Sequence, residues 1–388
     1  MVRLRAHRLQ RLQAELQRRD LPACLLFDPV NVRYATGSRN LQVWHLHGTG
    51  RHALVPAEGL PILFEYGGAE HLSGDLESIG EIRPALGLSY FSTGPRRRER
   101  MELWAAEIVA AYAAFAGKER RLAADRLTVD QAALLLGHGL TLVPADEPIE
   151  HARKVKNPDE IACMAASIAV ADTAMTRMRA ELAPGMTENE LWSILHKTNV
   201  ELGGEWIETR LLSSGPRTNP WYQECSDRVI EDGDLIAFDT DMIGPYGYCA
   251  DLSRTWLCGT AKPTSEQRRL FHLAHEQLQH NLQAAHSGMS FRELSERAWL
   301  VPDEFISPYN TCIAHGVGMR DEYPRITHPR YWTRGGYDGV IEPGMILSFH
   351  SYIGAPGGRE AVYLEQQVHF GERKTTLFSS FPFEEALL

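Results

Sequence analysis

Three acidic residues and two histidines in the second half of the chain are of the types that bind hard divalent cations. Asp239 and Asp251 stand twelve residues apart on either side of a Gly-Pro-Tyr-Gly turn, and His315 opens a His-Gly-Val-Gly sequence. Glu365 follows His350 by fifteen residues, with a Gly-Gly pair between them. Carboxylates combined with imidazole are typical ligands of Mn, Fe, Co or Zn at a two-metal site and are not those of a thiolate site. These residues therefore predict metal-assisted chemistry on a small polar substrate.

A predicted hairpin must carry the two aspartates. Residues 235–241 and 248–256 have the pattern of strands, and they flank Pro245. A hairpin that is symmetric about Pro245 places Asp239 directly opposite Asp251, with their Cβ atoms about 5 Å apart. Two carboxylates this close repel each other and raise one pKa, and a bound cation removes that penalty. The hairpin geometry therefore supports a metal site between these two residues.

A second predicted hairpin brings in the remaining ligands. Residues 345–350 form a predicted strand that leads to the Gly-Gly pair, and Glu365 returns opposite His350. In the first hairpin, Asp241 points to the same side as Asp239, because side chains alternate between the faces of a strand. The glycines that follow the histidine of the His-Gly-Val-Gly sequence allow the backbone to approach a site closely.

The composition limits which classes of protein and partner are compatible with the chain. With 388 residues, the chain is long enough for two domains with separate cores. The net charge of -10 argues against a nucleic-acid or anionic-membrane partner. No apolar run approaches the roughly 20 residues of a spanning helix, and the basic N-terminus lacks the apolar region of a signal peptide. The six cysteines form no Cys-x-x-Cys pair, so we expect reduced, mostly buried thiols and a cytoplasmic protein.

Two domains are predicted, an α/β unit over residues 1–150 and a mixed α+β unit over residues 151–388 that carries the candidate site. Strands and helices alternate in the first, which is typical of an α/β sheet. In the second, Asn157, Pro158 and Glu160 have the types and spacing of a capped helix N-terminus. The expected helices cover residues 2–19, 97–116, 128–136, 158–182, 187–202, 265–286 and 291–300, and the expected strands of the first domain cover residues 23–27, 52–55 and 61–64.

The order of the candidate ligands resembles that of the creatinase, aminopeptidase P and methionine aminopeptidase family, the pita-bread metalloenzymes. That family has the order Asp, Asp, His, Glu, Glu, which falls here on Asp239, Asp251, His315, His350 and Glu365. The resemblance implies a creatinase-like N-terminal domain, a pita-bread catalytic domain and two divalent metal ions. This chain departs from the pattern at His350, where a glutamate is expected. A neutral imidazole offers one donor nitrogen and cannot bridge two ions.

Two histidines of the family's proline-specific peptidases are missing. The first belongs to a Pro-His-Tyr sequence, and residues 220–222 read Pro-Trp-Tyr here. The second belongs to a His-Glu-x-Pro sequence, and residues 321–324 read Asp-Glu-Tyr-Pro. Both differences argue against a peptidase. The stretches 203–225, 238–241 and 315–322 are instead similar to the dimethylsulfoniopropionate lyases of this fold, the DddP type.

The resemblance to these lyases implies roles for individual residues. Asp241 is an added metal ligand, and Asp321 is the base that takes the α-proton of the substrate. Tyr309 or its neighbour Asn310 takes the place of a tyrosine that precedes the ligand histidine. Apart from the resemblance, a carboxylate base needs desolvation or a neighbouring acid to be strong enough, and Glu322 is the expected neighbouring acid. Iron is the expected metal, with Mn, Co or Zn as alternatives. The substrate is a small zwitterion whose sulfonium needs aromatic faces. The aromatic candidates are Trp206, Trp221, Tyr222, Tyr34 and Trp44.

Three functions stay open from the sequence. The first is a metal-dependent carbon–sulfur lyase. The second is a creatinase-like hydrolase of another small zwitterion, such as a betaine, an amidino compound or a cyclic amide. The third is a metal-free member that keeps the fold for binding, which the altered ligand His350 favours and the other four ligands oppose. The family resemblance also implies a homodimer.

Overall fold

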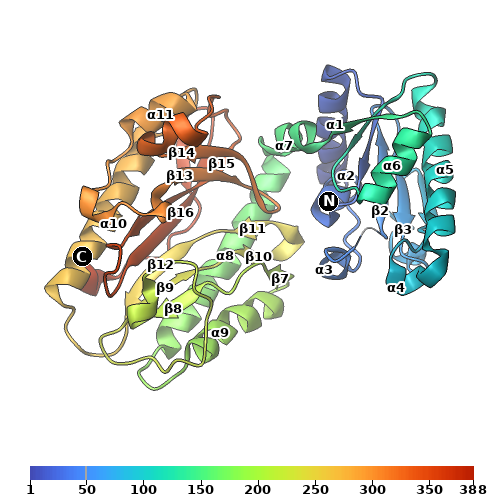
Figure 1. Ribbon diagram of the computed structural model, residues 1–388. Helices are drawn as coiled ribbons and strands as arrows, with labels where there is room; N and C mark the ends of the chain where they lie inside the picture. The colour runs from blue at the N-terminus through green and yellow to red at the C-terminus, as the bar shows by residue number, and fades with distance from the viewer. Residues whose placement is uncertain (49) are drawn as a thin grey trace. The chain divides into compact units, whose positions relative to one another are not determined.

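The computed structural model describes residues 1–48 and 50–388 as two compact units, Met1–Arg153 and Lys154–Leu388 (Figure 1). The expected boundary after residue 150 falls inside the last helix of the first unit, which ends at Arg153. Each unit has its own sheet and its own buried core. The candidate ligands all belong to the second unit.

The first unit is built on a mixed sheet of six strands. The strand order is β4-β3-β2-β1-β5-β6, with β1 antiparallel to β2 and parallel to β5. All four residues of β1 are buried, as expected for a central strand covered by helices. Trp104 and Ile108 belong to the same core as Leu25 of this strand. The elements are α1 (Val2–Arg18), β1 (Ala23–Leu26), α2 (Pro29–Thr36), α3 (Gln42–His45), β2 (His52–Pro56), β3 (Ile62–Glu65), β4 (Glu81–Pro84), α4 (Tyr90–Thr93), α5 (Arg97–Ala116), β5 (Arg121–Ala124), α6 (Val129–Gly137), β6 (Thr141–Pro144) and α7 (Asp146–Arg153).

The second unit contains three sheets held between helices. The strand orders are β14-β13-β15-β16-β17, β12-β9-β8 and β11-β10-β7. The strands lie between α8 and α9 on one side and α10 and α11 on the other (Figure 1). The elements are α8 (Pro158–Glu181), α9 (Glu188–Glu201), β7 (Trp206–Ile207), β8 (Leu212–Ser214), β9 (Leu235–Asp239), β10 (Met242–Ile243), β11 (Cys249–Ala250), β12 (Ser253–Leu257), α10 (Ser265–Ala284), α11 (Phe291–Arg297), β13 (Cys312–Val317), β14 (Asp321–Thr327), α12 (Trp332–Gly335), β15 (Ile346–Ile353), β16 (Val362–Phe370) and β17 (Thr375–Leu377).

The helices of the second unit begin at the predicted caps. The Glu160 amide donates to Asn157 Oδ1 at 2.8 Å, and the Asn157 amide donates back to Glu160 Oε2 at 3.1 Å, so α8 starts with a full capping box. Thr187 and Glu190 form the same box at the start of α9. The helix α11 ends at Arg297, before the expected residue 300. These caps are local, which is why the sequence located them.

The first hairpin of the site has a different register from the one expected. Asp239 pairs with Ser253, so it is not directly opposite Asp251. The turn is a short 3₁₀ segment in which Tyr246 has a φ of 66°. This left-handed residue centres the hairpin one position beyond Pro245 and shifts every cross-strand pair. The expectation that Asp239 and Asp251 form a cross-strand pair was wrong.

Two of the three sheets meet where β12 runs beside β16. Thr255 Oγ1 donates to the Tyr363 carbonyl at 2.9 Å and accepts from the Tyr363 amide at 3.0 Å. The Arg254 guanidinium donates to the Glu365 carbonyl at 2.7 Å. These bonds fix the backbone around Glu365 against the strand that pairs with Asp239. The two hairpins of the candidate site are thereby joined.

The cysteines and one long helix bear on the expectations from composition. All six cysteines are free thiols and buried, as expected.

The helix α8 is long and apolar enough to cross a membrane by length and composition, which corrects the expectation that no such segment exists. Half of that apolar window is buried inside the unit, where α8 contacts α9 and β11. An apolar face is what a core helix in this position needs.

Candidate metal centre

Three aspartates converge at the end of β9. Ligand oxygens of Asp239, Asp241 and Asp251 all lie within 4.8 Å of one another. Asp241 reaches this cluster through a kink, because its φ is 38° and β9 has already ended at Asp239. The Asp241 carboxylate accepts a hydrogen bond from the Thr209 hydroxyl, and the Asp251 amide donates to Gln367 Oε1 at 3.1 Å. Three acids with fixed backbones therefore share one small volume.

His315 of β13 joins the aspartates to the other acids. Its Nε2 lies 3.5 Å from Asp251 Oδ2 and 3.5 Å from Glu365 Oε1. Its Nδ1 lies 3.7 Å from Asp321 Oδ1. A Cβ atom at Gly316 would lie 2.6 Å from the carbonyl oxygen of Glu322, so glycine is required for β13 and β14 to approach here. The tight turn after β13 is what returns Asp321 to the side of the imidazole.

His350 and Glu365 complete the cluster from β15 and β16. They are directly opposite each other, as predicted for the second hairpin. The Ser253 hydroxyl donates to Glu365 Oε2 at 2.9 Å, and the Tyr363 hydroxyl lies 3.3 Å from His350 Nδ1. The rings of His350 and His315 are 5.6 Å apart. The six predicted metal ligands therefore come together within one unit.

The donor atoms of this cluster fit a divalent cation. Among the described residues, four buried atoms of this cluster accept or donate no hydrogen bond: Asp239 Oδ1, Asp251 Oδ2, Glu365 Oε1 and His350 Nε2. Asp251 Oδ2 and Glu365 Oε1 have His315 Nε2 as their nearest charged neighbour, at 3.5 Å each. Buried polar atoms without partners are costly unless a cation or another group satisfies them. Ligands that share one ion at a bond length near 2.1 Å lie about 3 to 3.5 Å apart, which matches the spacing of the acids around His315. The donor set therefore belongs to a divalent metal centre.

The protonation of the acids also points to a bound cation. Burial raises the pKa of Asp239 and of Asp251 well above the usual range, and the nearby Glu365 adds to both shifts. Burial and neighbouring acids raise the pKa of Asp241 to about 7. Burial lowers the pKa of His350 to about 4, so its imidazole is neutral at pH 7 and able to ligate. A divalent ion would replace the protons that these acids otherwise hold.

His315 and Glu365 form the ionised pair within the cluster. Burial opposes a charge on His315, but Asp321, Glu365 and Asp251 raise its pKa well above its usual range in the absence of a cation. Burial also favours the neutral form of Glu365, but the two histidines hold its pKa below the usual range. A cation would displace the imidazolium proton, because a metal-bound imidazole is neutral.

Glu322 does not supply the neighbouring acid that we expected beside Asp321. Consecutive residues of β14 point to opposite faces, and the Glu322 carboxylate forms a fully buried ion pair with the Lys156 ammonium. This carboxylate sits over Gly318, where a Cβ atom would be 2.1 Å from its oxygen. The side chain of Asp321 is 68% exposed, by contrast. The lysine neutralises Glu322, so it adds no free negative charge next to the base.

Aromatic rings form a group beside the centre. Trp221 stacks on Tyr363 with ring centroids 4.3 Å apart, and Tyr222 meets Tyr309 edge-on at 5.5 Å. Tyr309 in turn meets Tyr352 at 5.1 Å. Trp221 is buried, whereas Tyr222 is 67% exposed. Of the predicted aromatic candidates, Trp221 and Tyr222 therefore belong to this group. Tyr363 connects the group to the predicted ligands, because its hydroxyl contacts His350 and it lies two residues before Glu365 on β16.

The other aromatic candidates are not part of this group. The hydroxyl of Tyr34 donates to the Ala152 carbonyl at 2.9 Å inside the first unit, so its ring belongs to that core. Trp206 lies on β7 and pairs with Ile243, and among the described residues its ring contacts none of the aromatic group. Trp44 is exposed on α3 of the first unit. These three stay predictions without support from ring contacts.

Tyr309 and Asn310 differ in their contacts, and these favour Tyr309 as the residue beside the site. Asn310 is buried, and its amide donates to the Tyr352 carbonyl at 2.7 Å while its oxygen accepts from Ser307. Tyr309 is half-buried, and its ring faces Tyr222. Asn310 therefore holds the loop, and Tyr309 is the residue placed to contact a ligand.

Several residues that bear on the site were missed in the sequence. Tyr363 could have been found, because it stands two residues before Glu365 on the same strand and so shares its face. Thr209, Ser253 and Gln367 orient acids of the cluster, but nothing in their local sequence marks them. Lys156 was also missed as the partner of a site acid.

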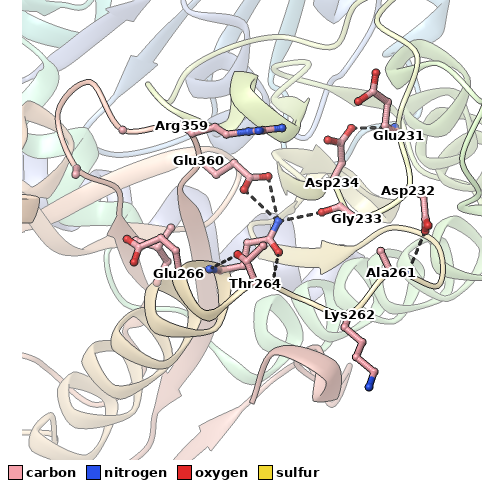
Figure 2. A pocket seen from close by; sticks show the side chains of 14 residues that line it. Glu231, Asp232, Gly233, Asp234, Ala261, Lys262, Thr264, Glu266, Arg359 and Glu360 are labelled. Atoms are coloured by element: carbon pink, nitrogen blue, oxygen red, sulfur yellow. Dashed lines mark hydrogen bonds between the residues drawn. The ribbon is translucent and has the colours of Figure 1, made fainter.

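A separate hollow of about 490 Å³ opens at the other end of β9 (Figure 2). Asp234 lies at the start of that strand, whereas Asp239 is at its end. The Glu360 carboxylate on its wall accepts hydrogen bonds from Gln267 Nε2, and Arg359 and Lys262 also line it. The hollow therefore shares no lining residue with the metal centre.

Two family models match this chain, one for each unit. The model of the Creatinase/Prolidase N-terminal domain matches residues 8–155. The model of metallopeptidase family M24 matches residues 162–372, which is more than half of the chain and includes the whole candidate centre. The chain belongs to metallopeptidase family M24. The predicted creatinase-like domain and pita-bread catalytic domain are confirmed for this M24 protein.

Two relatives of this M24 protein are similar over its whole length. The dimethylsulfoniopropionate lyase DddP of Roseovarius nubinhibens is 37% identical, with 100% of this chain and 88% of the relative covered. The DddP lyase of Roseobacter denitrificans is 36% identical with the same coverage. The predicted resemblance to the DddP type is therefore confirmed.

Solved structures of the family share the fold of this M24 protein. The Xaa-Pro dipeptidase of Bacillus anthracis superimposes with a TM-score of 0.77 at 19% identity, covering 98% of both chains. The prolidase of Thermococcus sibiricus gives 0.78 at 20% identity, again over 98% of both chains. At this level of identity the likeness concerns the fold alone.

Proposed function

We propose that this protein is a divalent-metal-dependent lyase that cleaves dimethylsulfoniopropionate to dimethyl sulfide and acrylate. The observation that carries the proposal is its similarity of 36–37% identity to two DddP lyases along its entire length. The site supports it, because Trp221 and Asp321 stand where the prolidase-type enzymes of the family are expected to have histidines. A Xaa-Pro peptidase activity is therefore not proposed.

Six residues are proposed as ligands of two divalent ions, with iron as the favoured metal and Mn, Co or Zn as alternatives. The unpartnered, buried oxygens of Asp239, Asp251 and Glu365 and the free Nε2 of His350 support this assignment. Asp241 and His315 complete the set. When bound, the cations supply Lewis acidity toward the substrate carboxylate and so acidify its α-carbon.

Asp321 is proposed as the base. Its carboxylate is exposed and lies 3.7 Å from the imidazole of His315, so it borders the centre on the side that solvent and substrate can reach. It takes a proton from the α-carbon, the electron pair forms the double bond to the β-carbon, and the bond from the β-carbon to sulfur breaks. Sulfur leaves with that electron pair as neutral dimethyl sulfide, and the product is acrylate. General-base removal of this kind contributes roughly 10²- to 10⁴-fold in rate.

The sulfonium is proposed to bind against the aromatic group. A cation over an aromatic face gains roughly 0.5–2 kcal/mol. Tyr222 offers an exposed ring. This ring meets Tyr309 edge-on, and Tyr222 directly follows the buried Trp221 in the chain. Tyr363 connects the aromatic group to the centre, because it stacks on Trp221 and its hydroxyl contacts His350, so the two charges of the zwitterion have separate places to bind.

A hydrolase of another small zwitterion is the second candidate. His350 favours it, because a ligand that differs from the family pattern fits a change of substrate. A metal-free binding protein is not supported, since the cluster contains buried atoms that no residue of the described chain satisfies. A homodimer and a cytoplasmic location are also proposed, on the family resemblance and the cysteine pattern.

Product analysis tests the proposed function. Protein loaded separately with Fe(II), Mn(II), Co(II) and Zn(II) is mixed with dimethylsulfoniopropionate, and dimethyl sulfide and acrylate are measured in parallel. The proposal predicts equal amounts of both products with at least one metal, and no release of proline from an alanyl-proline dipeptide. No dimethyl sulfide with any metal would contradict it and favour the hydrolase.

A further inference from the structure

The loop that follows β8 carries two aromatic side chains of the site. It leaves the sheet at Ser214, contains Trp221 and Tyr222, and returns at Ser226. At its far end, Trp221 stacks on Tyr363, and Asn219 Nδ2 donates to the carbonyls of residues 355 and 358 at 2.8 and 3.0 Å. These contacts hold the far end of the loop, and separate contacts hold its base.

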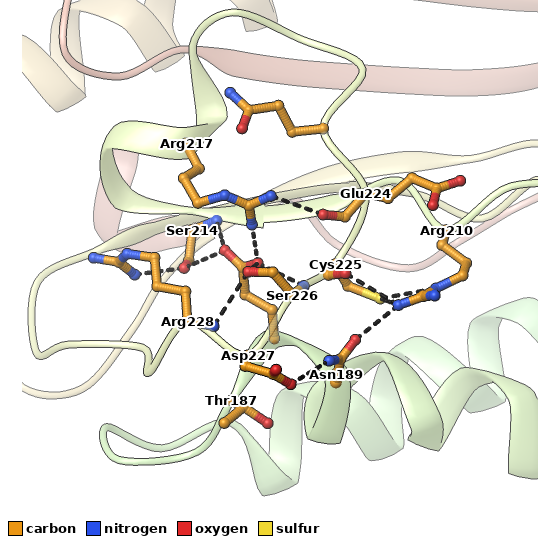
Figure 3. A network of polar contacts seen from close by, with 12 residues as sticks. Thr187, Asn189, Arg210, Ser214, Arg217, Glu224, Cys225, Ser226, Asp227 and Arg228 are labelled. Carbon is orange, nitrogen blue, oxygen red and sulfur yellow. Dashed lines mark hydrogen bonds and ion pairs between the residues drawn. The ribbon is translucent and has the colours of Figure 1, made fainter.

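One buried carboxylate holds both ends of that loop. Glu188, the first residue of α9, has no exposed surface. Its Oε1 accepts from the Ser214 amide at 2.8 Å and the Ser214 hydroxyl at 2.7 Å. Its Oε2 accepts from the Ser226 amide at 3.0 Å and the Ser226 hydroxyl at 2.7 Å. The two ends of the loop are thus joined through a single side chain. Figure 3 shows Ser214, Arg217 and Ser226 close together in this network.

An arginine inside the loop completes the arrangement. One guanidinium nitrogen of Arg217 forms an ion pair with Glu188, and the other donates to the Glu224 carbonyl at 2.9 Å. Backbone bonds reinforce the closure, since the Asn189 amide donates to the Ser226 carbonyl at 3.1 Å. We call Glu188, Ser214, Arg217 and Ser226 the loop clamp.

The clamp requires a charged acceptor at this position. Five donors converge on the two oxygens of Glu188, and a buried carboxylate is stable only when it is neutralised and fully hydrogen-bonded. An amide in its place would direct an NH₂ group at one pair of serine donors and would lose the ion pair with Arg217. A capping acid alone does not explain this environment, because the cap of α9 is already provided by Thr187 and Glu190.

We infer that Glu188 is a positioning residue that holds the loop of residues 215–225 so that Trp221 and Tyr222 face the metal centre and the bound sulfonium. The inference rests on the proposed function for its substrate, and on the contacts alone for the order of the loop. Glu188 touches no substrate and no metal ligand. It acts through the loop ends that it joins.

The test compares Glu188→Gln with Arg217→Ala and with a matched control, Glu190→Ala. The control removes an acid from the same first turn of α9, together with its bonds to Thr187, but leaves the loop untouched. Arg217 is 28% exposed, and Arg217→Ala weakens the clamp by a second route, because the four serine donors to Glu188 stay in place. For each metal-loaded protein we would measure amide hydrogen exchange of residues 215–226, metal content, and kcat and KM separately.

We expect Glu188→Gln and Arg217→Ala to speed exchange in residues 215–226 while metal content stays at the wild-type level. KM for dimethylsulfoniopropionate should rise about tenfold with a smaller change in kcat, as for the loss of one cation–π contact. Glu190→Ala should change neither the exchange of this loop nor KM.

Unchanged exchange and KM in both clamp variants would overturn the inference, and so would an equal rise of KM in Glu190→Ala. The proposed function fails separately, if wild-type protein releases no dimethyl sulfide. Exchange in residues 215–226 then still decides whether Glu188 orders the loop.

Discussion

His350 and Glu365 are directly opposite residues of β15 and β16, and the Tyr363 hydroxyl lies 3.3 Å from Nδ1 of His350. This contact leaves Nε2 as the nitrogen that can bind a cation, and Nε2 is buried without a hydrogen-bond partner in the described chain. A histidine in this position gives one neutral donor, where the family pattern has a carboxylate with two oxygens and a charge. This position therefore carries one negative charge less than that pattern, while Asp241, which the pattern lacks, adds one elsewhere in the cluster.

Restoring the carboxylate should strengthen the centre. We expect His350→Glu to raise the affinity for Mn(II) or Fe(II) by about tenfold or more, because the ligand charge increases and a second oxygen can bridge. Metal content after dialysis and calorimetric titration measure this. His369→Glu is the control, since it makes the same exchange on β16, opposite Ile346 and outside the centre. Unchanged occupancy combined with lost lyase activity would mean that His350 has a catalytic role of its own.

Ionisation of Asp241 should oppose folding of the cation-free protein. Burial raises its pKa from 3.8 to about 7, so the penalty is absent below pH 3.8 and complete above about pH 7. Asp241→Asn should therefore stabilise cation-free protein at pH 8, on the order of 4 kcal/mol, and have no effect near pH 4. Urea unfolding in EDTA measures the difference.

With Mn(II) present the sign should reverse, because the wild-type acid then contributes to metal binding and the asparagine does not. Asp303→Asn is the matched control, as its side chain is 87% exposed. A constant difference between wild type and Asp241→Asn at every pH would show that this carboxyl does not titrate as the structure indicates.

The exposed ring of Tyr222 should bind the sulfonium. We expect Tyr222→Ala to raise KM for dimethylsulfoniopropionate about 2- to 30-fold, and to leave inhibition by the uncharged thioether 3-(methylthio)propionate unchanged, because only the cation loses its contact. Tyr90→Ala is a suitable control, since Tyr90 is also exposed, at 69%, and lies on α4 of the first unit. Equal losses of affinity for both compounds would point to general disorder of the site instead.

Asp321 should be needed for turnover and dispensable for folding. Asp321→Asn should lower kcat about 10²- to 10⁴-fold. The change should leave the free energy of unfolding within about 0.5 kcal/mol, because the side chain is exposed. Metal content and urea unfolding accompany the rate measurement. Near-normal kcat with full metal content would remove Asp321 from the mechanism.

Local signals in the sequence predicted most elements of the fold. The capping boxes of Asn157 with Glu160 and of Thr187 with Glu190 lie within one helical turn, and both helices start where they indicate. The second hairpin was also predicted in register, because the positive φ of 74° at the centre of its turn falls on Gly357, a residue type that marks such a position in the sequence. Where one turn of chain decides the structure, the sequence was sufficient.

The register of the first hairpin could not be predicted from its sequence. Strand alternation alone cannot reveal that Tyr246 adopts a left-handed conformation, nor that Asp241 leaves the strand with a φ of 38°. Both shifts bring Asp241 into the cluster, although the pairing that we expected between Asp239 and Asp251 does not form. The predicted ligands do lie together, but the hairpin register that brings them together differs from the one expected.

Ion pairs between distant segments could not be predicted at all. Lys156 neutralises Glu322, and Arg217 and two serines enclose Glu188. Neither acid differs in local sequence from an exposed one. Their partners are set by the packing of the second unit, which no short pattern encodes.

The most direct test of the account is the fate of deuterium at the α-carbon. Dimethylsulfoniopropionate carrying two α-deuterons would be turned over by the metal-loaded protein, and its three-carbon product analysed by mass spectrometry. Removal of the α-proton predicts acrylate that keeps one of the two deuterons, formed in equal amount to dimethyl sulfide. A product that keeps both deuterons, such as 3-hydroxypropionate formed by attack of water at the β-carbon, would contradict elimination at this centre.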